Sequence, residues 1–320
     1  MQGFFGESDT KAEHQLNTAL TGPSGRRLRG RTLSVAGRGW LECAYDRRLM
    51  ATPAGVVRVR TVRYRAHNGL AREAHIALPG DLGPAHNPPV PLIISPHGRG
   101  ISGRANLGFW GNLPGLGRFA VISPEGHGRV LPLHSWGWER QIDDLANMQY
   151  VAKATLPWLR IRPHGVYAMG GSMGGQETLL LVARFNTLLA GAAVFDSPTD
   201  LARRYRDFAR IPNGRSLQEL ARREIGGVPE SFPGAYARRS PINSARAIAF
   251  SRVPLQMFWS VADEVVLDQA HNSAALFRRI KELNAAAPVT AVAGNWTHSV
   301  GMPVNLPQAL RRFGLLPADV

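Results

Sequence analysis

Cysteine, lysine and long apolar runs are nearly absent from this chain of 320 residues. Cys43 is the single cysteine, so no disulfide can form within one chain. No apolar run approaches the ~18 residues of a membrane span. Residues 1–20 include the charged residues Glu7, Asp9, Lys11 and Glu13 and lack the apolar stretch of a secretory signal. We therefore expect a cytoplasmic protein with no membrane span, in which residues 1–30 form a tail or a loosely docked arm.

The formal charge of +15 comes almost entirely from arginine, because only Lys11, Lys153 and Lys281 are lysines. The arginines are spread along the chain, and the sequence contains no recognisable motif of a nucleic-acid-binding module. We expect no specific nucleic-acid partner. The composition leaves the oligomeric state open, including a homo-oligomer.

Short apolar segments alternate with segments of helical composition, which favours a mostly parallel α/β sheet. A half-buried hairpin, with Asn68-Gly69 as its turn, comes first. The expected strands are Val57–Arg65, Ala71–Leu78, Val90–Ser95, Phe119–Ser123, Gly165–Met169, Gly191–Phe195, Pro254–Ser260 and Val289–Ala293. The expected helices are Glu139–Leu159, Gln176–Arg184, about Asp268–Ala285 and Gln308–Phe313. We expect one catalytic domain over residues 31–320, with residues 201–250 as a helical insertion before the last two strands.

The run Gly170-Gly171-Ser172-Met173-Gly174-Gly175 joins an apolar strand to a helix-forming segment. In that context a Gly-x-Ser-x-Gly motif predicts a nucleophile elbow, which exposes the serine hydroxyl at the end of the strand. A phosphate-binding loop of the Walker type would need Gly-Lys-Ser/Thr, which is missing. Ser172 is therefore the candidate nucleophile.

A serine nucleophile needs a histidine base, and the histidine needs a carboxylate that orients it. His298 follows the last expected strand, in a segment that we interpret as a loop, whereas His271 falls within a helix. Asp263 follows the penultimate strand and is the leading acid. Asp196 and Asp200, after the preceding strand, remain alternatives. We expect the side chain of Glu264 to point away from the site.

An acyl transfer also needs donors for the developing oxyanion. The backbone N–H of Met173 is one candidate, and the turn His97-Gly98-Arg99-Gly100 offers another, which we assign to Arg99. Trp136, Trp138 and Trp296 fall in loops near strand ends and are candidates to line a substrate pocket. No metal-ligand spacing stands out, so we expect neither a metal nor a cofactor.

These motifs resemble the prolyl-oligopeptidase-like family of α/β-hydrolases. The resemblance covers about residues 55–315 and is carried by Tyr167–Gly175, His97-Gly98, Gly226-Gly227-Val228-Pro229, Tyr236, Ser240-Pro241, Val253-Pro254, Asp263-Glu264-Val265-Val266, Gln269 and His298. It implies an α/β-hydrolase sheet and a Ser172–Asp263–His298 triad. Peptidases of the family usually carry a β-propeller, and the segment before residue 90 is too short for one.

We therefore expect a serine hydrolase, and within that class a carboxylester hydrolase acting on a small ester through an acyl-enzyme. The alternative with the same mechanism is a peptidase or aminopeptidase acting on short peptides. An alternative of another class is a catalytically silent α/β-hydrolase used as a binding module.

Overall fold

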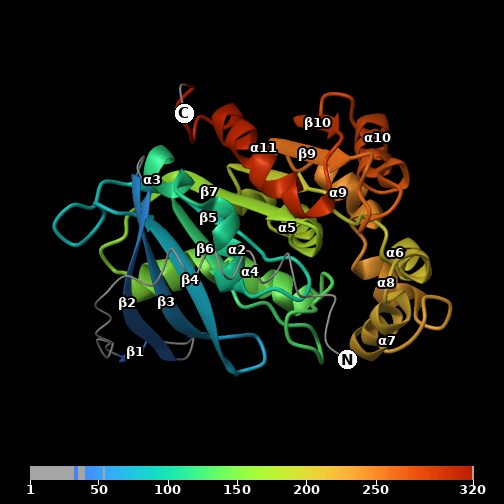
Figure 1. Cartoon of the computed structure of the whole chain (residues 1–320), viewed down its shortest axis with the longest axis horizontal. Coiled ribbons are helices and arrows are strands. Elements are labelled where there is room, and N and C mark those ends of the chain that lie inside the picture. Colours follow the sequence, from blue (N-terminus) through green and yellow to red (C-terminus); the bar gives the residue numbers. More distant parts are fainter. Residues whose placement is uncertain (1–31, 35–39, 53–54, 319–320) are drawn as a thin grey trace.

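The computed structural model describes residues 32–34, 40–52 and 55–318. The expected N-terminal arm, residues 1–30, lies outside the described residues. Within them a single ten-stranded sheet runs through the molecule in the order β1-β2-β3-β4-β6-β5-β7-β8-β9-β10 (Figure 1). Its strands are β1 (Thr32–Ser34), β2 (Trp40–Thr52), β3 (Gly55–Arg65), β4 (Ala71–Pro79), β5 (Val90–Ile94), β6 (Ala120–Pro124), β7 (Ile161–Gly171), β8 (Gly191–Phe195), β9 (Leu255–Ser260) and β10 (Val289–Gly294).

The sheet is antiparallel at one edge and parallel over the rest. Strands β1 to β4 pair antiparallel in chain order, and β4 joins the parallel part through β6. The turn between β3 and β4 contains Gly69 at φ 77°, a conformation that glycine adopts without strain. From β6 to β10 all neighbouring strands are parallel, as their short, fully buried apolar sequences predict.

Helices cover both faces of the parallel strands. They are α2 (Gly103–Asn106), η1 (Leu107–Trp110), α3 (Leu113–Gly117), α4 (Glu139–Thr155), α5 (Met173–Arg184), η2 (Asn186–Leu188), α6 (Leu201–Asp207), η3 (Phe208–Arg210), α7 (Gly214–Ile225), α8 (Pro233–Arg238), η4 (Pro241–Ser244), α9 (Ala245–Ala249), η5 (Gln269–His271), α10 (Ser273–Leu283) and α11 (His298–Arg312), where η marks a 3₁₀ helix.

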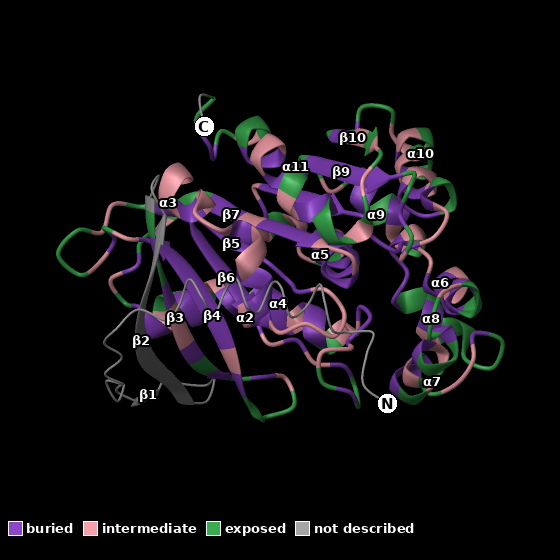
Figure 2. Ribbon diagram, in the orientation of Figure 1, coloured by how far each residue is buried: buried purple, intermediate pink, exposed green. Residues whose placement is uncertain are grey.

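Two apolar clusters lie on opposite faces of the sheet, and Figure 2 shows the buried strands between the helical layers. One cluster joins the strands to α4, α5, α9 and α10. The other joins them to η1 and α11. Neighbouring residues of β5 divide between the two clusters: Leu92 and Ile94 face one, and Ile93 faces the other. This alternation is the pleat of a strand buried on both faces.

The segment between β8 and β9 is helical, and most of it packs away from the sheet. Helices α6 to α8 gather at one side of the molecule (Figure 1), where they share a third apolar cluster with Trp136 and Met173. The end of the segment differs, since α9 packs in the same cluster as α5 and α10. Residues 201–240 therefore form the part that stands over the strand ends, and α9 belongs to a layer that covers the sheet.

Three helix predictions are wrong at their boundaries. The helix expected at about Asp268–Ala285 is divided into η5 and α10, which begins at Ser273. Helix α4 ends at Thr155 rather than at Leu159, because Leu156 precedes Pro157 and takes an extended ψ of 77°. The closing helix is much longer than residues 308–313: α11 begins at His298 and contains Pro303 and Pro307. Its buried face, which includes Met302 and Leu306, packs against the sheet and offsets the hydrogen bonds that the prolines cannot make.

Candidate active site

Ser172 occupies the sharp turn between β7 and α5. Its backbone has φ 54° and ψ −126°, outside the regions that residues with a Cβ favour. The turn is held by a hydrogen bond from the Ser172 N–H to the Phe195 carbonyl (2.8 Å). A Cβ on Gly170 would lie 2.6 Å from the backbone of Gly174, so the crossing of strand and helix requires glycine. The Ser172 hydroxyl makes no hydrogen bond with another side chain within the described part of the chain.

A cavity of about 490 Å³ opens beside Ser172. It lies where β5, β7, β8 and β9 end, the edge at which parallel sheets bind ligands. Most of its wall is apolar, and its polar lining includes Ser172, His298, Arg99, Arg204 and Glu264. One cavity thus brings together the candidate nucleophile, the candidate base and two arginines.

His298 is held by Asp263. The His298 Nδ1 lies 3.0 Å from the Asp263 Oδ2, and the two side chains are 14% and 1% exposed. Oδ1 of Asp263 accepts the backbone N–H groups of Val265 (2.9 Å) and Val266 (2.8 Å). Burial alone would raise the pKa of Asp263, but hydrogen bonds from His298 and Gln269 outweigh it and hold this pKa below its ordinary value. The carboxylate is therefore charged, fixed and directed at the imidazole.

Asp196 is a second buried acid close to the same histidine. A carboxylate oxygen of Asp196, a carboxylate oxygen of Asp263 and a ring nitrogen of His298 all lie within 4.8 Å of one another. The carboxylate of Asp196 accepts the backbone N–H of Ser260 (2.7 Å) and the indole N–H of Trp296 (2.8 Å). Burial raises the pKa of Asp196 to about 6, although the interaction with nearby His298 acts in the opposite direction and lowers it. Asp196 thus anchors two other segments of the chain, while Asp263 makes the hydrogen bond to His298.

The turn that follows β5 lies directly against Ser172. A Cβ on Gly98 would lie 3.9 Å from the Cβ of Ser172, and one on Gly174 would lie 2.1 Å from the Pro96 carbonyl oxygen. His97 fastens this turn: its Nδ1 lies 2.7 Å from the Gly98 carbonyl, and its Nε2 accepts the N–H of Gly126 at 2.8 Å. Burial lowers the pKa of His97, which suits a neutral ring that donates from one nitrogen and accepts at the other.

The candidate oxyanion donors Met173 and Arg99 both line the cavity beside Ser172. Met173 is the first residue of α5, so its N–H has no acceptor within the helix. In the facing turn the N–H of Gly100 is bound to the Leu133 carbonyl (3.0 Å), whereas Arg99 lines the cavity.

Of the three candidate tryptophans, Trp136 lines this cavity and the other two do not. Trp136 packs against Phe208, with ring centroids 6.1 Å apart. Trp138 instead meets His67 edge-on at 4.7 Å, because it stands at the start of α4. The indole N–H of Trp296 is used by buried Asp196. The expectation that Trp138 and Trp296 line the substrate pocket does not hold for this cavity.

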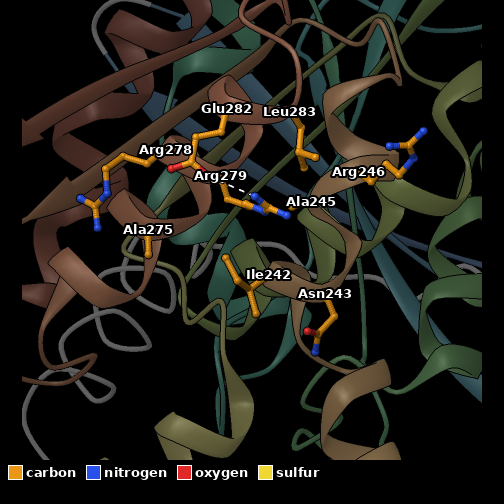
Figure 3. Close-up of a pocket in the computed structure, with 9 residues that line it drawn as sticks. All are labelled: Ile242, Asn243, Ala245, Arg246, Ala275, Arg278, Arg279, Glu282 and Leu283. Carbon is orange, nitrogen blue, oxygen red and sulfur yellow. Dashed lines mark hydrogen bonds and ion pairs between the residues drawn. The ribbon is translucent and has the colours of Figure 1, made fainter.

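A hollow elsewhere on the molecule has different chemistry. It lies between η4, α9 and α10 (Figure 3), and its lining holds Arg246, Arg278 and Arg279, the last paired with Glu282 at 3.2 Å. Its lining contains no serine, cysteine or histidine. A candidate nucleophile and a candidate base therefore line the cavity beside Ser172, and neither lines this hollow.

The only group of three potential metal ligands within the described residues is Asp196, Asp263 and His298. Both carboxylates already accept hydrogen bonds from the protein, as described above. No helix among the described residues is long and apolar enough to cross a membrane.

Solved structures resemble this one over most of its length. A puromycin hydrolase matches with a TM-score of 0.60 and 18% identity over 92% of this chain and 47% of its own. The S-formylglutathione hydrolase FrmB of Staphylococcus aureus matches with a TM-score of 0.61 and 13% identity over 81% of this chain and 99% of its own. This protein has the α/β-hydrolase fold. A carboxyl esterase from Tuber melanosporum matches with a TM-score of 0.60 and 14% identity, covering 82% of this chain and 86% of its own.

The chain thus spans about half the length of the puromycin hydrolase, and nearly all of FrmB. Prolyl oligopeptidase B from Galerina marginata also matches, at 14% identity and a TM-score of 0.57, over 90% of this chain and 41% of its own. The resemblance of this chain to prolyl-oligopeptidase-like α/β-hydrolases is confirmed at the level of the fold. No family model and no curated protein matches the sequence.

The sequence prediction missed two residues that line the candidate site. Glu264 was expected to point away, yet it lines the cavity and its Oε2 accepts the His298 N–H at 3.1 Å. That N–H is the first of α11 and has no acceptor within the helix, so a neighbouring carboxylate is favoured there. Arg204 was not singled out at all. A signal exists, since Arg204 shares the apolar face of Leu201, Tyr205 and Phe208 at helical spacing.

Helices α6 to α8 are fastened over the cavity by Glu224 and Arg239. Glu224 is fully buried and accepts the backbone N–H groups of Val130 (2.8 Å) and Leu131 (3.0 Å). Arg239 pairs with it at 3.3 Å and also donates to the Ser135 carbonyl at 2.5 Å. These contacts fix the loop that carries Trp136, so they set one wall of the cavity.

Proposed function

We propose that this protein is a serine hydrolase that cleaves a carboxylic ester through an acyl-enzyme on Ser172. The observation that carries the proposal is the strained turn at half-buried Ser172, which shares its cavity with a histidine bonded to a buried aspartate. A serine hydroxyl is a weak nucleophile, and this surrounding supplies the base that it needs.

In the proposed reaction His298 takes the proton of the Ser172 hydroxyl as the oxygen attacks the substrate carbonyl carbon. Asp263 holds the imidazole by Nδ1, so that Nε2 is the atom that exchanges protons. In a ligand-free enzyme the hydrogen bond between serine and histidine is often long, and it tightens when substrate binds. The charge that develops on the carbonyl oxygen is met by the N–H groups of Met173 and Arg99, each worth ~3 kcal/mol in comparable sites.

The tetrahedral intermediate then collapses, and the alcohol leaves with the proton that His298 returns to it. In the second half His298 takes a proton from water, the resulting hydroxide attacks the acyl carbon, and the acid leaves as Ser172 regains its proton. No step needs a metal or an organic cofactor.

The ester assignment is supported by similar structures whose length this chain nearly spans: FrmB and the Tuber esterase are matched over 99% and 86% of their lengths. The similarity to a puromycin hydrolase and to an acylaminoacyl peptidase from Pyrococcus horikoshii favours the alternative of a serine peptidase. Both would use the same residues, and we propose residues 31–320 as the catalytic domain in either case.

A panel of p-nitrophenyl esters and aminoacyl p-nitroanilides, assayed with the wild-type protein and with Ser172→Ala, tests the proposal. We expect ester hydrolysis to dominate and to fall by about 10⁴-fold or more in the variant. Anilide cleavage without ester preference would make the protein a peptidase. Ester hydrolysis that persists in a folded Ser172→Ala protein would reject the mechanism.

A further inference from the structure

Arg204 is a buried cation in the wall of the candidate active-site cavity. It lies on α6, in the segment over the strand ends, and is 4% exposed. Within the described part of the chain its guanidinium makes one hydrogen bond, from Nη1 to the Val265 carbonyl. Its flat face rests on the ring of Phe208, with Cζ 4.5 Å from the centroid. These contacts hold the group in place without neutralising it.

No described carboxylate forms an ion pair with Arg204, although acids lie nearby. Asp263 is engaged by His298, and Asp207 pairs at 3.5 Å with Arg210. The other arginine in the cavity, Arg99, opposes rather than relieves the charge. Burial and the repulsion from Arg99 lower the pKa of Arg204 to about 10, which still leaves it protonated near neutral pH. Burying an unpaired charge is costly, so an anion that reached Arg204 would bind favourably.

We propose that Arg204, assisted by Arg99, binds a carboxylate of the substrate, so that the natural substrate is an anionic ester or amide. A guanidinium presents paired N–H donors that match a carboxylate. Because Asp196 and Glu264 line the same cavity, a single negative charge suits it better than a dianion. The inference rests on the proposed hydrolysis at Ser172, and it names the class of substrate for that site.

The alternative to substrate recognition is a purely structural role for Arg204, because its hydrogen bond to the Val265 carbonyl steadies the loop that carries Asp263. A structural role would affect charged and neutral substrates equally, whereas recognition of a carboxylate affects only the charged one. The informative quantity is therefore the ratio of kcat/KM for a carboxylate substrate to kcat/KM for its neutral match.

Two substrate pairs place the carboxylate on either side of the scissile bond. Mono-p-nitrophenyl adipate and p-nitrophenyl hexanoate compare acyl groups. 3-Acetoxybenzoate and its methyl ester compare leaving groups. We expect the ratio in the wild-type protein to exceed one in at least one pair. In Arg204→Met that ratio should fall by about 10- to 100-fold, with a smaller fall in Arg204→Lys, which keeps the charge but loses the fork.

Arg206→Met is the matched control, because Arg206 lies on the same helix and forms a surface pair with Glu230 at 3.7 Å. It removes the same charge and should change the ratio by less than about twofold. The wild-type preference should also persist at about 0.5 M NaCl, which screens steering by the net charge but not a buried contact.

A wild-type ratio below one in both pairs overturns the inference, as does an unchanged ratio in Arg204→Met. If that variant does not fold, the wild-type ratios and Arg204→Lys decide. The rate at which a fluorophosphonate labels Ser172, with and without monomethyl adipate or benzoate, both of which carry one negative charge, gives a readout that needs no turnover. Protection that is strong in the wild-type protein, weaker in Arg204→Lys and absent in Arg204→Met supports the inference. Lack of protection in the wild-type protein, or equal protection in Arg204→Met, contradicts it. Lack of labelling altogether would instead refute the proposed function.

Discussion

The Nδ1 of His298 lies 3.0 Å from Oδ2 of Asp263, while Asp196, which is equally buried, directs its carboxylate to Trp296 and Ser260. Strands β8 and β9 are neighbours in the sheet, so the acids that follow them lie close to the same histidine. The hydrogen bonds distinguish them: one acid orients the imidazole, and the other holds the chain around it.

Asp263→Asn and Asp196→Asn should separate these two roles. Asp263→Asn places an amide at His298 and favours the wrong tautomer, so we expect kcat to fall by about 10³- to 10⁴-fold. Asp196→Asn sets an amide N–H₂ near the Trp296 N–H or the Ser260 N–H, which should lower the free energy of unfolding by ~1–3 kcal/mol and reduce kcat much less. Kinetics and thermal unfolding of both variants check this. A larger loss of kcat in folded Asp196→Asn would make Asp196 the triad acid.

Gly174→Ala should damage the proposed oxyanion site. The new Cβ would lie 2.1 Å from the Pro96 carbonyl oxygen, so the turn after β5 must move away from α5. A displacement of about 1 Å in a catalytic group can cost about 10²-fold, and we expect a fall in kcat/KM of that order. Gly83→Ala, which would meet nothing within 4 Å, is the control. Equal ester hydrolysis by the two variants would refute the assignment of this turn.

Glu224→Gln should loosen helices α6 to α8. An amide cannot accept all the N–H groups that converge on this buried carboxylate, and it leaves Arg239 without its partner. Breaking a buried ion pair costs about 3–5 kcal/mol, which a fall in Tm or in the denaturant midpoint would reveal. Glu230→Gln, on the surface pair with Arg206, should change stability by less than about 1 kcal/mol. Similar effects for the two variants would mean that Glu224 does not fasten these helices.

Glu177→Gln should remove a pH dependence from stability. Glu177 is buried beside Ser135, and burial raises its pKa to about 8 from an ordinary 4.5. The folded state therefore holds a proton that the unfolded state releases, so the wild-type protein loses stability as pH rises from about 4.5 to about 8. Glutamine has the shape of the neutral carboxyl group and does not titrate. The free energy of unfolding of Glu177→Gln, relative to that of the wild-type protein, should therefore grow by up to about 3 kcal/mol between pH ~6 and pH ~8. Unfolding measured across that range tests this, and a constant difference would contradict it.

The sequence predicts the parts of this protein that depend on short-range chemistry. The turn at Ser172 and the buried strands are specified by residues next to one another, and chain order suffices to select His298 and Asp263 as candidates. The start of α11 at His298 is not predictable in this way, because Pro303 and Pro307 oppose a helix that only packing against the sheet stabilises.

The direction of a side chain is harder to predict than its place in the chain. Glu264 turns toward the site because the first N–H of α11 needs an acceptor, which is known only once α11 is placed. The ring of Trp138 packs against His67 and the indole of Trp296 binds Asp196, and neither tryptophan lines the cavity. Arg204 comes from a helix whose position depends on the buried pair of Glu224 and Arg239.

Covalent labelling of Ser172 tests the central claim most directly. The intact protein is treated with a fluorophosphonate, and the modified peptide is identified by mass spectrometry, with Ser172→Ala and heat-denatured protein as controls. A single adduct on Ser172 of the folded wild-type protein, and none in either control, is the predicted result. A folded protein that remains unlabelled, or one that is labelled at another residue, would contradict the account of Ser172 as an activated nucleophile.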